Sequence, residues 1–194
     1  MHLDVTADSY GYYPRTMVRL SDIANYSLDK IPVAVAALGL RVVWGPAELT
    51  KDDEPYSRMF VCMRAQPNEY TVVIRGTDPL SWEAWWDEDF AIAKTEPFNQ
   101  LAPHAPANAL VSQGTFNGIN DLLSLEDPST KQGVVQFLQG AKPKYLYVTG
   151  HSLGGTLTPP MFALLNDHLY GGGWVSNMAL WSFAGLTPGD AGFN

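Results

Sequence analysis

The chain has very little of what disulfide-rich or nucleic-acid-binding proteins need. It contains one cysteine, Cys62, so no internal disulfide can form. Lys and Arg number 12 against 20 Asp and Glu, which gives a net charge of −8. No basic cluster is present that could follow a phosphate backbone, so we do not expect nucleic acid as a partner. Cys62 itself lies in the apolar run 59–63, which predicts a buried, small hydrophobic side chain.

Long apolar runs are missing as well. No stretch approaches the roughly 20 apolar residues of a transmembrane helix, so we expect a soluble protein. The first residues, MHLDVTADSYGYY, have neither the basic start nor the apolar middle of a signal peptide. The sequence therefore leaves open whether the protein is secreted or cytoplasmic. Its acidity disfavours docking on anionic membranes but not on a neutral lipid–water interface.

Hydrophobic residues make up 46% of the 194 residues, enough for a core, and we predict one α/β domain over residues 1–194. Apolar segments of strand and helix type alternate, which predicts a largely parallel sheet with helices on both faces. The expected strands are 40–44, 57–64, 70–75, 145–148 and 178–183. The expected helices are one or two within 20–38, then 116–125, 132–138 and one ending at His168. Residues 1–15 and 94–108 are expected to be irregular, with Ser21 or Asp22 as a possible helix cap.

The stretch YLYVTGHSLGG, residues 145–155, carries the clearest chemistry. An apolar strand runs into Gly150-His151-Ser152-Leu153-Gly154, which fits the pattern G-x-S-x-G, and a helix-forming segment follows. A serine on such a sharp strand-to-helix turn has strained backbone angles and needs small neighbours. We therefore predict that Ser152 is a nucleophile and that the backbone N–H of Leu153 donates to an oxyanion. The alternative is a glycine-rich turn with an incidental serine.

Together with two further segments, this stretch resembles the class 3 (fungal-type, Rhizomucor-like) lipases of the α/β-hydrolase superfamily. YTVVIRGT at 70–77 resembles the family's V-x-F-R-G-[ST] strand and oxyanion loop. WSFAGLTPGDAGF at 181–193 resembles its Y-T-F-G-x-P-R-V-G-N-x-x-F strand and turn. The similarity covers roughly residues 56–194. It implies an α/β-hydrolase fold and a serine ester hydrolase that requires no metal or organic cofactor.

The resemblance also assigns roles around the serine. It implies that Thr77 supplies a second oxyanion N–H, with its hydroxyl holding the loop; the alternative is a threonine in an ordinary strand-end turn. The cluster Trp82, Trp85 and Trp86 follows at the position where the family carries a lid over the acyl pocket. Those rings are equally suited to packing in the core.

A general base is hard to find among the four histidines. His2 is near the terminus, His104 is in a proline-rich stretch, and His151 should point away from its neighbour Ser152. His168 would lie about 24 Å from Ser152 on one helix, unless the chain folds back at the two prolines 159 and 160.

The superfamily's chain order is serine, acid, histidine. The resemblance places the acid and the histidine beyond Asn194, with Asp190 as a minor candidate acid. We therefore expect residues 1–194 to be the N-terminal portion of the domain, lacking its last strands and incomplete as a catalyst.

Several functions are compatible with these motifs. The leading hypothesis is a carboxylic-ester hydrolase of the triacylglycerol lipase type, acting on lipid or small ester substrates through an acyl-enzyme on Ser152. Phospholipases and simple esterases share the motifs, and the tryptophans favour a lipase. A non-catalytic binding protein on the same fold is one alternative, because no base is evident. A serine acyltransferase or peptidase is another, because the turn alone does not select the acceptor.

Overall fold

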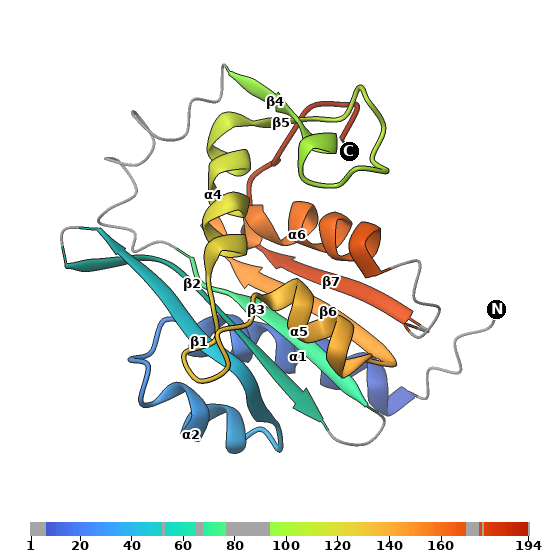
Figure 1. Cartoon of the computed structure of the whole chain (residues 1–194). Coiled ribbons are helices and arrows are strands. Elements are labelled where there is room, and N and C mark those ends of the chain that lie inside the picture. The colour runs from blue at the N-terminus through green and yellow to red at the C-terminus, as the bar shows by residue number, and fades with distance from the viewer. Residues whose placement is uncertain are drawn as a thin grey trace.

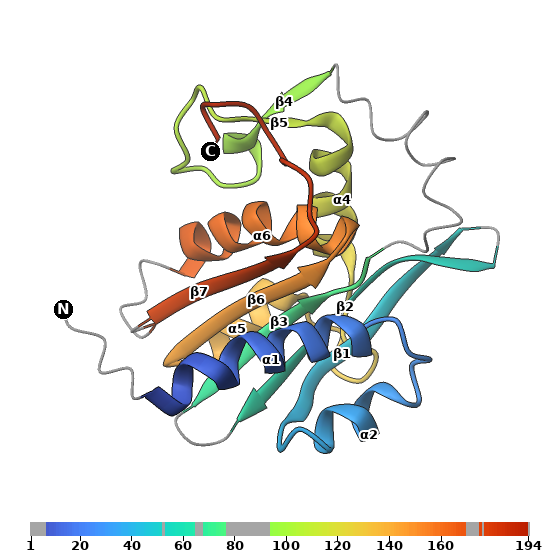
Figure 2. The same cartoon turned by 180° about the vertical axis from the view of Figure 1, so that it is seen from behind.

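A five-stranded sheet in the order β1-β2-β3-β6-β7 forms the centre of the molecule (Figures 1 and 2). The computed structural model describes residues 7–51, 53–64, 68–76, 94–169, 175 and 177–193, with side chains from residue 13 onward. The strands of the sheet are β1 (Arg41–Lys51), β2 (Glu54–Arg64), β3 (Glu69–Ile74), β6 (Tyr145–His151) and β7 (Asn177–Phe183). Above it, β4 (Thr95–Pro97) pairs with β5 (Leu110–Ser112) beside the short 3-10 helix η1 (Phe98–Gln100).

Helices cover both faces of the sheet, as the sequence predicts. One face carries α1 (Ala7–Ile23) and α2 (Ile31–Ala36), and the other carries α4 (Gln113–Ser124), α5 (Val134–Ala141) and α6 (Leu153–Leu169) (Figures 1 and 2). Within the described ranges, no helix combines the length and the hydrophobicity needed to cross a bilayer.

The sheet is mixed, and the prediction of a largely parallel sheet is wrong in this respect. β1 pairs antiparallel with β2, and β2 with β3, whereas β3 with β6 and β6 with β7 are parallel. Parallel neighbours need a crossover of about a dozen residues or more. Only two residues separate the end of β1 at Lys51 from the start of β2 at Glu54, and four separate Arg64 at the end of β2 from Glu69 at the start of β3. These short connections can only form hairpins.

The N-terminal segment is helical, where an irregular arm was expected. Pro14 lies inside α1, and Ser21 lies in its last turn and does not cap a helix. Met17, Leu20 and Ile23 are buried, so the helix presents an apolar stripe to the sheet. The hydroxyl of Ser21 is 3.1 Å from that of Thr149 in β6, and this contact fastens α1 beneath the strand that leads to Ser152. Tertiary packing therefore outweighs the weak local helix signal.

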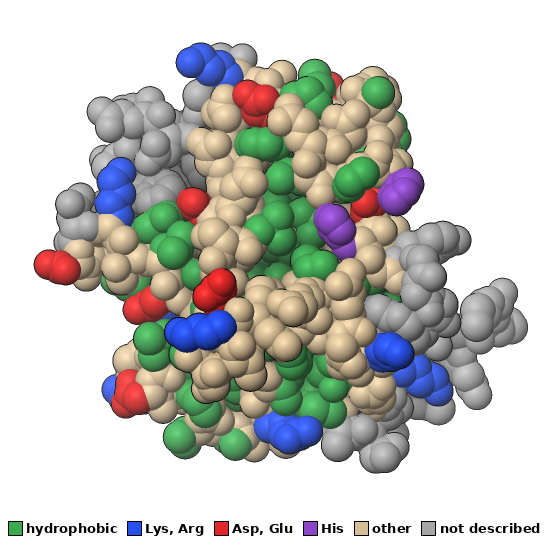
Figure 3. Space-filling view, viewed as in Figure 1, with side chains coloured by type: hydrophobic (Ala, Val, Ile, Leu, Met, Phe, Trp, Pro, Cys, Tyr) green, Lys and Arg blue, Asp and Glu red, His purple; other side chains and the backbone are tan. Residues whose placement is uncertain are grey.

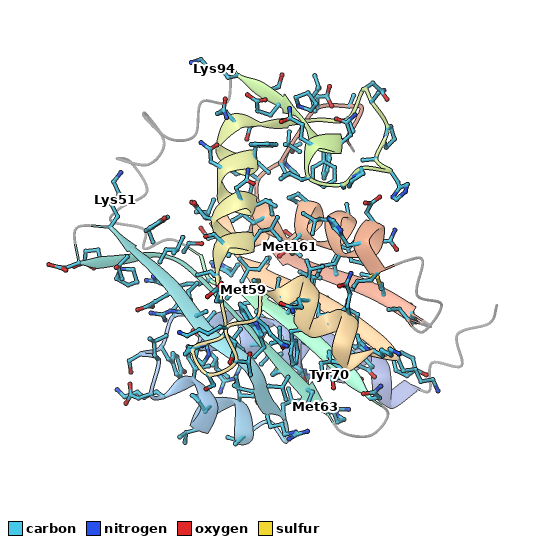
Figure 4. All side chains as sticks on the ribbon, viewed as in Figure 1. Lys51, Met59, Met63, Tyr70, Lys94 and Met161 are labelled. Carbon is cyan, nitrogen blue, oxygen red and sulfur yellow. The ribbon has the colours of Figure 1, made fainter. Side chains whose placement is uncertain are left out.

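Side chains alternate across the sheet and form two core layers. Phe60 and Cys62 of β2 face α1, whereas Met59 faces the opposite helices. Figure 4 labels Met59 and, on α6, Met161, which share this second layer. Cys62 is fully buried, as predicted, and burial raises the pKa of its thiol.

A buried carboxylate joins α1 to the start of β3. Glu69 is 3% exposed, and the hydroxyl of Tyr13 donates a hydrogen bond to its Oε2 at 3.1 Å. Burial raises the pKa of Glu69, although the Arg64 guanidinium, 4.0 Å away, and the Tyr13 hydrogen bond act in the opposite direction. Glu69 therefore binds its proton more tightly in the folded state than in the unfolded state.

This shift predicts a pH-dependent stability difference for Glu69→Gln. Because the folded-state pKa is raised, the free energy of unfolding falls as the pH rises from the ordinary glutamate value through the raised value. The introduced amide cannot ionise, so the variant should gain stability relative to the parent between acidic and neutral pH. Urea unfolding at one acidic pH and at neutral pH measures this gain in the free energy of unfolding. Glu54→Gln, at an exposed position of β2, is the matched control. An equal difference at both pH values would contradict the prediction.

Candidate active site

Ser152 lies between β6 and α6 in a strained conformation. Its φ is +58°, a left-handed value that residues other than glycine rarely adopt. Its backbone N–H donates to the carbonyl of Phe183 at 2.9 Å, and its carbonyl accepts from the N–H of Thr156 at 2.9 Å. The main chain is thus held from both sides while the residue stays partly exposed. The strand, sharp turn and helix predicted around this serine are present.

The glycines beside Ser152 lie where no side chain would fit. A Cβ at Gly154 would lie 2.5 Å from the carbonyl oxygen of Ile74 in β3. A Cβ at Gly155 would lie 2.6 Å from the carbonyl oxygen of Phe183 in β7, and one at Gly150 would overlap the carbonyl of Gly154. The obstacles are backbone atoms, which cannot move aside as a flexible side chain could. The start of α6 can therefore contact β3, β6 and β7 only with glycine at these positions.

The end of β3 lies directly against the turn. Ile74 pairs with Gly150 in the parallel ladder, and Gly76 follows two residues later. A Cβ at Gly76 would be 3.4 Å from the Cβ of Ser152. The predicted oxyanion loop thus begins in contact with the predicted nucleophile. Thr77, the expected donor, lies outside the described residues, as do Trp82, Trp85 and Trp86.

Leu153 is the first residue of α6. Backbone N–H groups in the first turn of a helix have no acceptor within the helix, and the helix dipole places partial positive charge there. A negative charge that develops beside Ser152 would meet this end of α6. The described geometry is compatible with charge stabilisation by Leu153, and this role stays a prediction.

A set of contacts that the sequence did not reveal attaches the loop after β7 to α6. The hydroxyl of Ser182 donates to the carbonyl of Gly155 at 2.8 Å, and the N–H of Leu186 donates to the hydroxyl of Thr156 at 2.9 Å. Gly185 lies so close that a Cβ there would be 2.7 Å from the Thr156 nitrogen. In the sequence, only the small residues Ser182 and Gly185 indicated that this stretch could lie close to another segment. Their effect is to fix the first turn of α6, and with it Ser152.

His104 forms a pair with Asp167, remote from Ser152. Its Nδ1 is 3.1 Å from the Asp167 carboxylate, which also accepts the backbone N–H of His104 at 3.0 Å. The helix α6 is continuous from Leu153 to Leu169, although it contains two prolines. At about 1.5 Å per residue, Asp167 lies about 22 Å along the axis from Ser152. The pair has the chemistry of a general base and its orienting acid, but not the position.

The side chains of the two other described histidines are not hydrogen-bonded to Ser152 either. The Nε2 of His168 lies 3.1 Å from the carbonyl of Leu101, and the unbroken helix keeps it as far from Ser152 as predicted. His151 is the last residue of β6, and its side chain is exposed. His2 lies outside the described residues.

The carboxylate of Asp190 has a structural position. It accepts the backbone N–H groups of Gly192 at 2.9 Å, Phe193 at 3.1 Å and Leu110 at 3.3 Å. These contacts close a turn and hold the last described residues alongside β5. Asp190 is thereby explained as a turn residue.

Two cavities lie near α6. The smaller, of about 320 Å³, is bordered by Leu153, Ile74 and Arg75, so it adjoins the turn. The larger, of about 620 Å³, lies between α6 and the segment around η1, with apolar walls that include Phe98 and Phe162. Figure 3 shows apolar side chains gathered in this hollow, with histidine at its edge. In the described part of the chain, no three His, Cys, Asp or Glu side chains are grouped to hold a metal ion.

Comparisons with known proteins connect this geometry to one fold. No family model and no curated protein matches the chain. Among solved structures, the M37 lipase is similar at 25% identity and a TM-score of 0.71, over 92% of this chain and 61% of that one. The Rhizomucor miehei lipase in a propeptide complex follows at 20% identity and a TM-score of 0.64, over 100% and 60%. A triacylglycerol lipase from Penicillium expansum has 16% identity and a TM-score of 0.61, over 97% and 65%.

These matches confirm the resemblance to the fungal-type lipases that the sequence motifs indicated. They also give the chain an α/β-hydrolase-like fold, with a mixed sheet between helices. The chain spans about three fifths of the length of these lipases.

The crowding at the turn predicts that Gly154→Ala destabilises the protein. The new methyl group would meet two carbonyl oxygens, of Ile74 and Arg75, within 2.9 Å, and overpacking of this kind costs about 1–3 kcal/mol. Gly140→Ala in α5 is the matched control, because a Cβ there meets nothing within 4 Å. That change should stabilise the protein by up to about 1 kcal/mol. Urea unfolding midpoints measure both, and a Gly154→Ala variant as stable as the parent would refute the close contact.

Proposed function

We propose that this chain, which has the fold of the fungal-type lipases, bears the nucleophile of a serine carboxylic-ester hydrolase that acts on acylglycerols. The observation that carries the proposal is the conformation of Ser152. A left-handed serine held between a strand and a helix stores strain that an ordinary connection would avoid. Three glycines and the end of β3 are arranged around it to permit this. Such strain is typical of functional sites and is the geometry of a nucleophile elbow.

The proposed reaction proceeds through an acyl-enzyme. The Oγ of Ser152 attacks the ester carbonyl carbon while a general base takes its proton. The resulting oxyanion receives the backbone N–H groups of Leu153 and Thr77, and the alcohol leaves with the proton returned by the base. Water then attacks the acyl-enzyme, the ester of Ser152 breaks, and the carboxylic acid is released. The base and its orienting acid are proposed to come from outside the described residues.

Lipids are favoured over other esters by two observations. The solved structures that the chain resembles are named as lipases, one of them a triacylglycerol lipase. The segment with Trp82, Trp85 and Trp86 begins eight residues after β3 ends at Ile74, beside the Ser152 turn. Tryptophan is apolar with one polar N–H, which suits a lipid–water interface, and we propose that this segment is a lid.

A binding protein without catalysis is the second candidate. It is supported by the described histidines, because none of their rings is hydrogen-bonded to Ser152. A binding protein would have no need of a strained serine, which is why we place it second. Reaction of Ser152 with a fluorophosphonate separates the two candidates, because only an activated serine is phosphonylated.

Ser152→Ala in the full-length protein should lower turnover of a short p-nitrophenyl ester by about 10³-fold or more, since the nucleophile is lost. It should also abolish the one-probe increase in intact mass after fluorophosphonate treatment. Ser129→Ala, at an exposed loop position, is the matched control and should retain both activities. Unchanged ester turnover in Ser152→Ala would disprove the assignment.

The lid predicts a dependence on the physical state of the substrate. If the tryptophan segment opens at an interface, the hydrolysis rate should rise steeply once an acylglycerol ester exceeds its solubility limit. Replacing Trp82, Trp85 and Trp86 by serine should flatten this rise while turnover of dissolved ester continues. A smooth saturation curve through the solubility limit in the parent protein would count against a lid.

A further inference from the structure

The connection between α1 and α2 contains an acceptor motif for N-linked glycans. Its residues Asn25-Tyr26-Ser27 fit the pattern N-x-[ST], in which the middle residue is not proline. The chain has nine asparagines, and Asn25 alone has Ser or Thr two positions later. A tripeptide of this kind also occurs by chance, so its surroundings in the fold decide whether it could carry a glycan.

The main chain of this connection is fixed, and its side chains are accessible. The guanidinium of Arg58 in β2, which is buried, donates through Nη1 to the carbonyls of Ala24, at 3.0 Å, and of Tyr26. The backbone is thereby held on both sides of Asn25. The three residues of the motif are all exposed, so a group attached to Asn25 would extend into solvent without displacing any packed side chain.

The amide nitrogen that would be modified is loosely bonded. The Nδ2 of Asn25 donates to the carbonyl of Ser21 at 3.3 Å and to that of Asp22 at 3.4 Å, both long for hydrogen bonds. A glycosylated amide keeps one of its two N–H groups. It could therefore retain one of these contacts with the end of α1 while the sugar takes the place of the other hydrogen.

Apolar side chains are exposed on either side of this asparagine. Among the described residues, five large hydrophobic side chains are exposed, and four of them lie between positions 18 and 33: Val18, Tyr26, Leu28 and Val33. Val33 in α2 is 72% exposed. The Tyr26 hydroxyl donates to Asp22 at 3.4 Å, one helical turn after Val18, so Tyr26 lies along the same face of α1.

These residues lie on one side of the sheet. Figure 2 shows α1 and α2 together on that face, joined by the connection that carries Asn25. Exposed apolar groups that gather in one region usually mark a surface that something covers. The acceptor motif lies in the middle of this region, which identifies what could cover it.

We propose that Asn25 carries an N-linked glycan that shields the apolar side chains exposed around it. The inference is independent of the proposed function of Ser152. In the transfer, Nδ2 forms a bond to the anomeric carbon of a lipid-linked oligosaccharide, the bond from that carbon to the diphosphate oxygen breaks, and the amide loses one proton. The glycan is bulky and solubilising, so it would hinder a second copy of the chain from approaching Val33 and its neighbours.

Passage of the full-length protein through a secretory pathway tests the site. The protein, given a cleavable secretion leader, is produced in yeast and recovered from cells and medium. Its intact mass should exceed that of the bare chain, and peptide-N-glycosidase should remove the excess and leave aspartate at position 25. Ser27→Ala should lose the excess although Asn25 is still present, and Ser27→Thr should keep it.

Asn120→Gln is the matched control, because Asn120 is exposed but lies outside any acceptor motif, and it should keep the added mass. A parent protein recovered only at the mass of the bare chain would overturn the proposal. So would an added mass that persists in both Asn25→Gln and Ser27→Ala.

Self-association tests the shielding. At a concentration where the glycosylated parent sediments as a monomer, Asn25→Gln and Ser27→Ala should sediment as dimers or larger species. Ser27→Ala retains the Asn25 side chain, so a shared result cannot be due to loss of its hydrogen bonds. Adding Leu28→Ser and Val33→Ser to the Asn25→Gln protein should restore the monomer. Glycan-free variants that remain monomers, or association that the two serines leave unchanged, would overturn the shielding.

Discussion

Close approach of backbone to backbone at one point governs this structure. The first turn of α6 touches the ends of β3 and β7 through glycine, and no side chain separates these segments. The strained conformation of Ser152 persists because its main chain is bonded to Phe183 on one side and Thr156 on the other. Neither a slightly longer connection nor one added methyl group would preserve this contact. The rest of the fold therefore keeps the ends of β3, β6 and β7 in contact with the first turn of α6.

The mixed sheet brings these strand ends together beside Ser152. The parallel strands β3, β6 and β7 all end at the same edge, which is where ligands bind in open α/β sheets. β3 is the strand that joins the two halves, pairing antiparallel with β2 and parallel with β6. The hairpin of β1 and β2 extends beyond this edge and lines the cavity beside Ser152. The antiparallel half thus shapes the space in which the parallel half places its serine.

Much of the fold could be predicted from local patterns, and what could not was decided by contacts distant in sequence. The motif around Ser152 predicted a strand, a turn and a helix because its glycines have a direct steric meaning. The helix α1 was missed because Gly11 and Pro14 weaken its local signal, and packing of Met17 and Leu20 against the sheet compensates. The short turn before β3 indicates an antiparallel pair, whereas the alternation of strands and helices further along favours parallel pairing.

The candidate site follows the same division. Leu153 and the glycines were accessible from the sequence, since their roles depend on neighbours along the chain. The attachment of α6 by Ser182 and Leu186 was not, because each hydrogen bond joins residues that are far apart in the sequence. The position of Asn117 and Asp121 beside the smaller cavity could not be recognised either, since polar residues on a helix face usually contact only solvent.

The connection between β3 and β6 has a consequence for how the molecule assembles. The first three strands pair with their sequence neighbours, whereas joining Ile74 to Gly150 encloses β4, β5, α4 and α5 in one long loop. Closing a long loop is entropically more costly than closing a hairpin, and such non-local pairings form slowly. The hairpins can therefore be in place while the residues around Ser152 are still far apart in space. The arrangement around Ser152 would form in the last stage of folding, and a compact chain that had formed only its local structure would lack it.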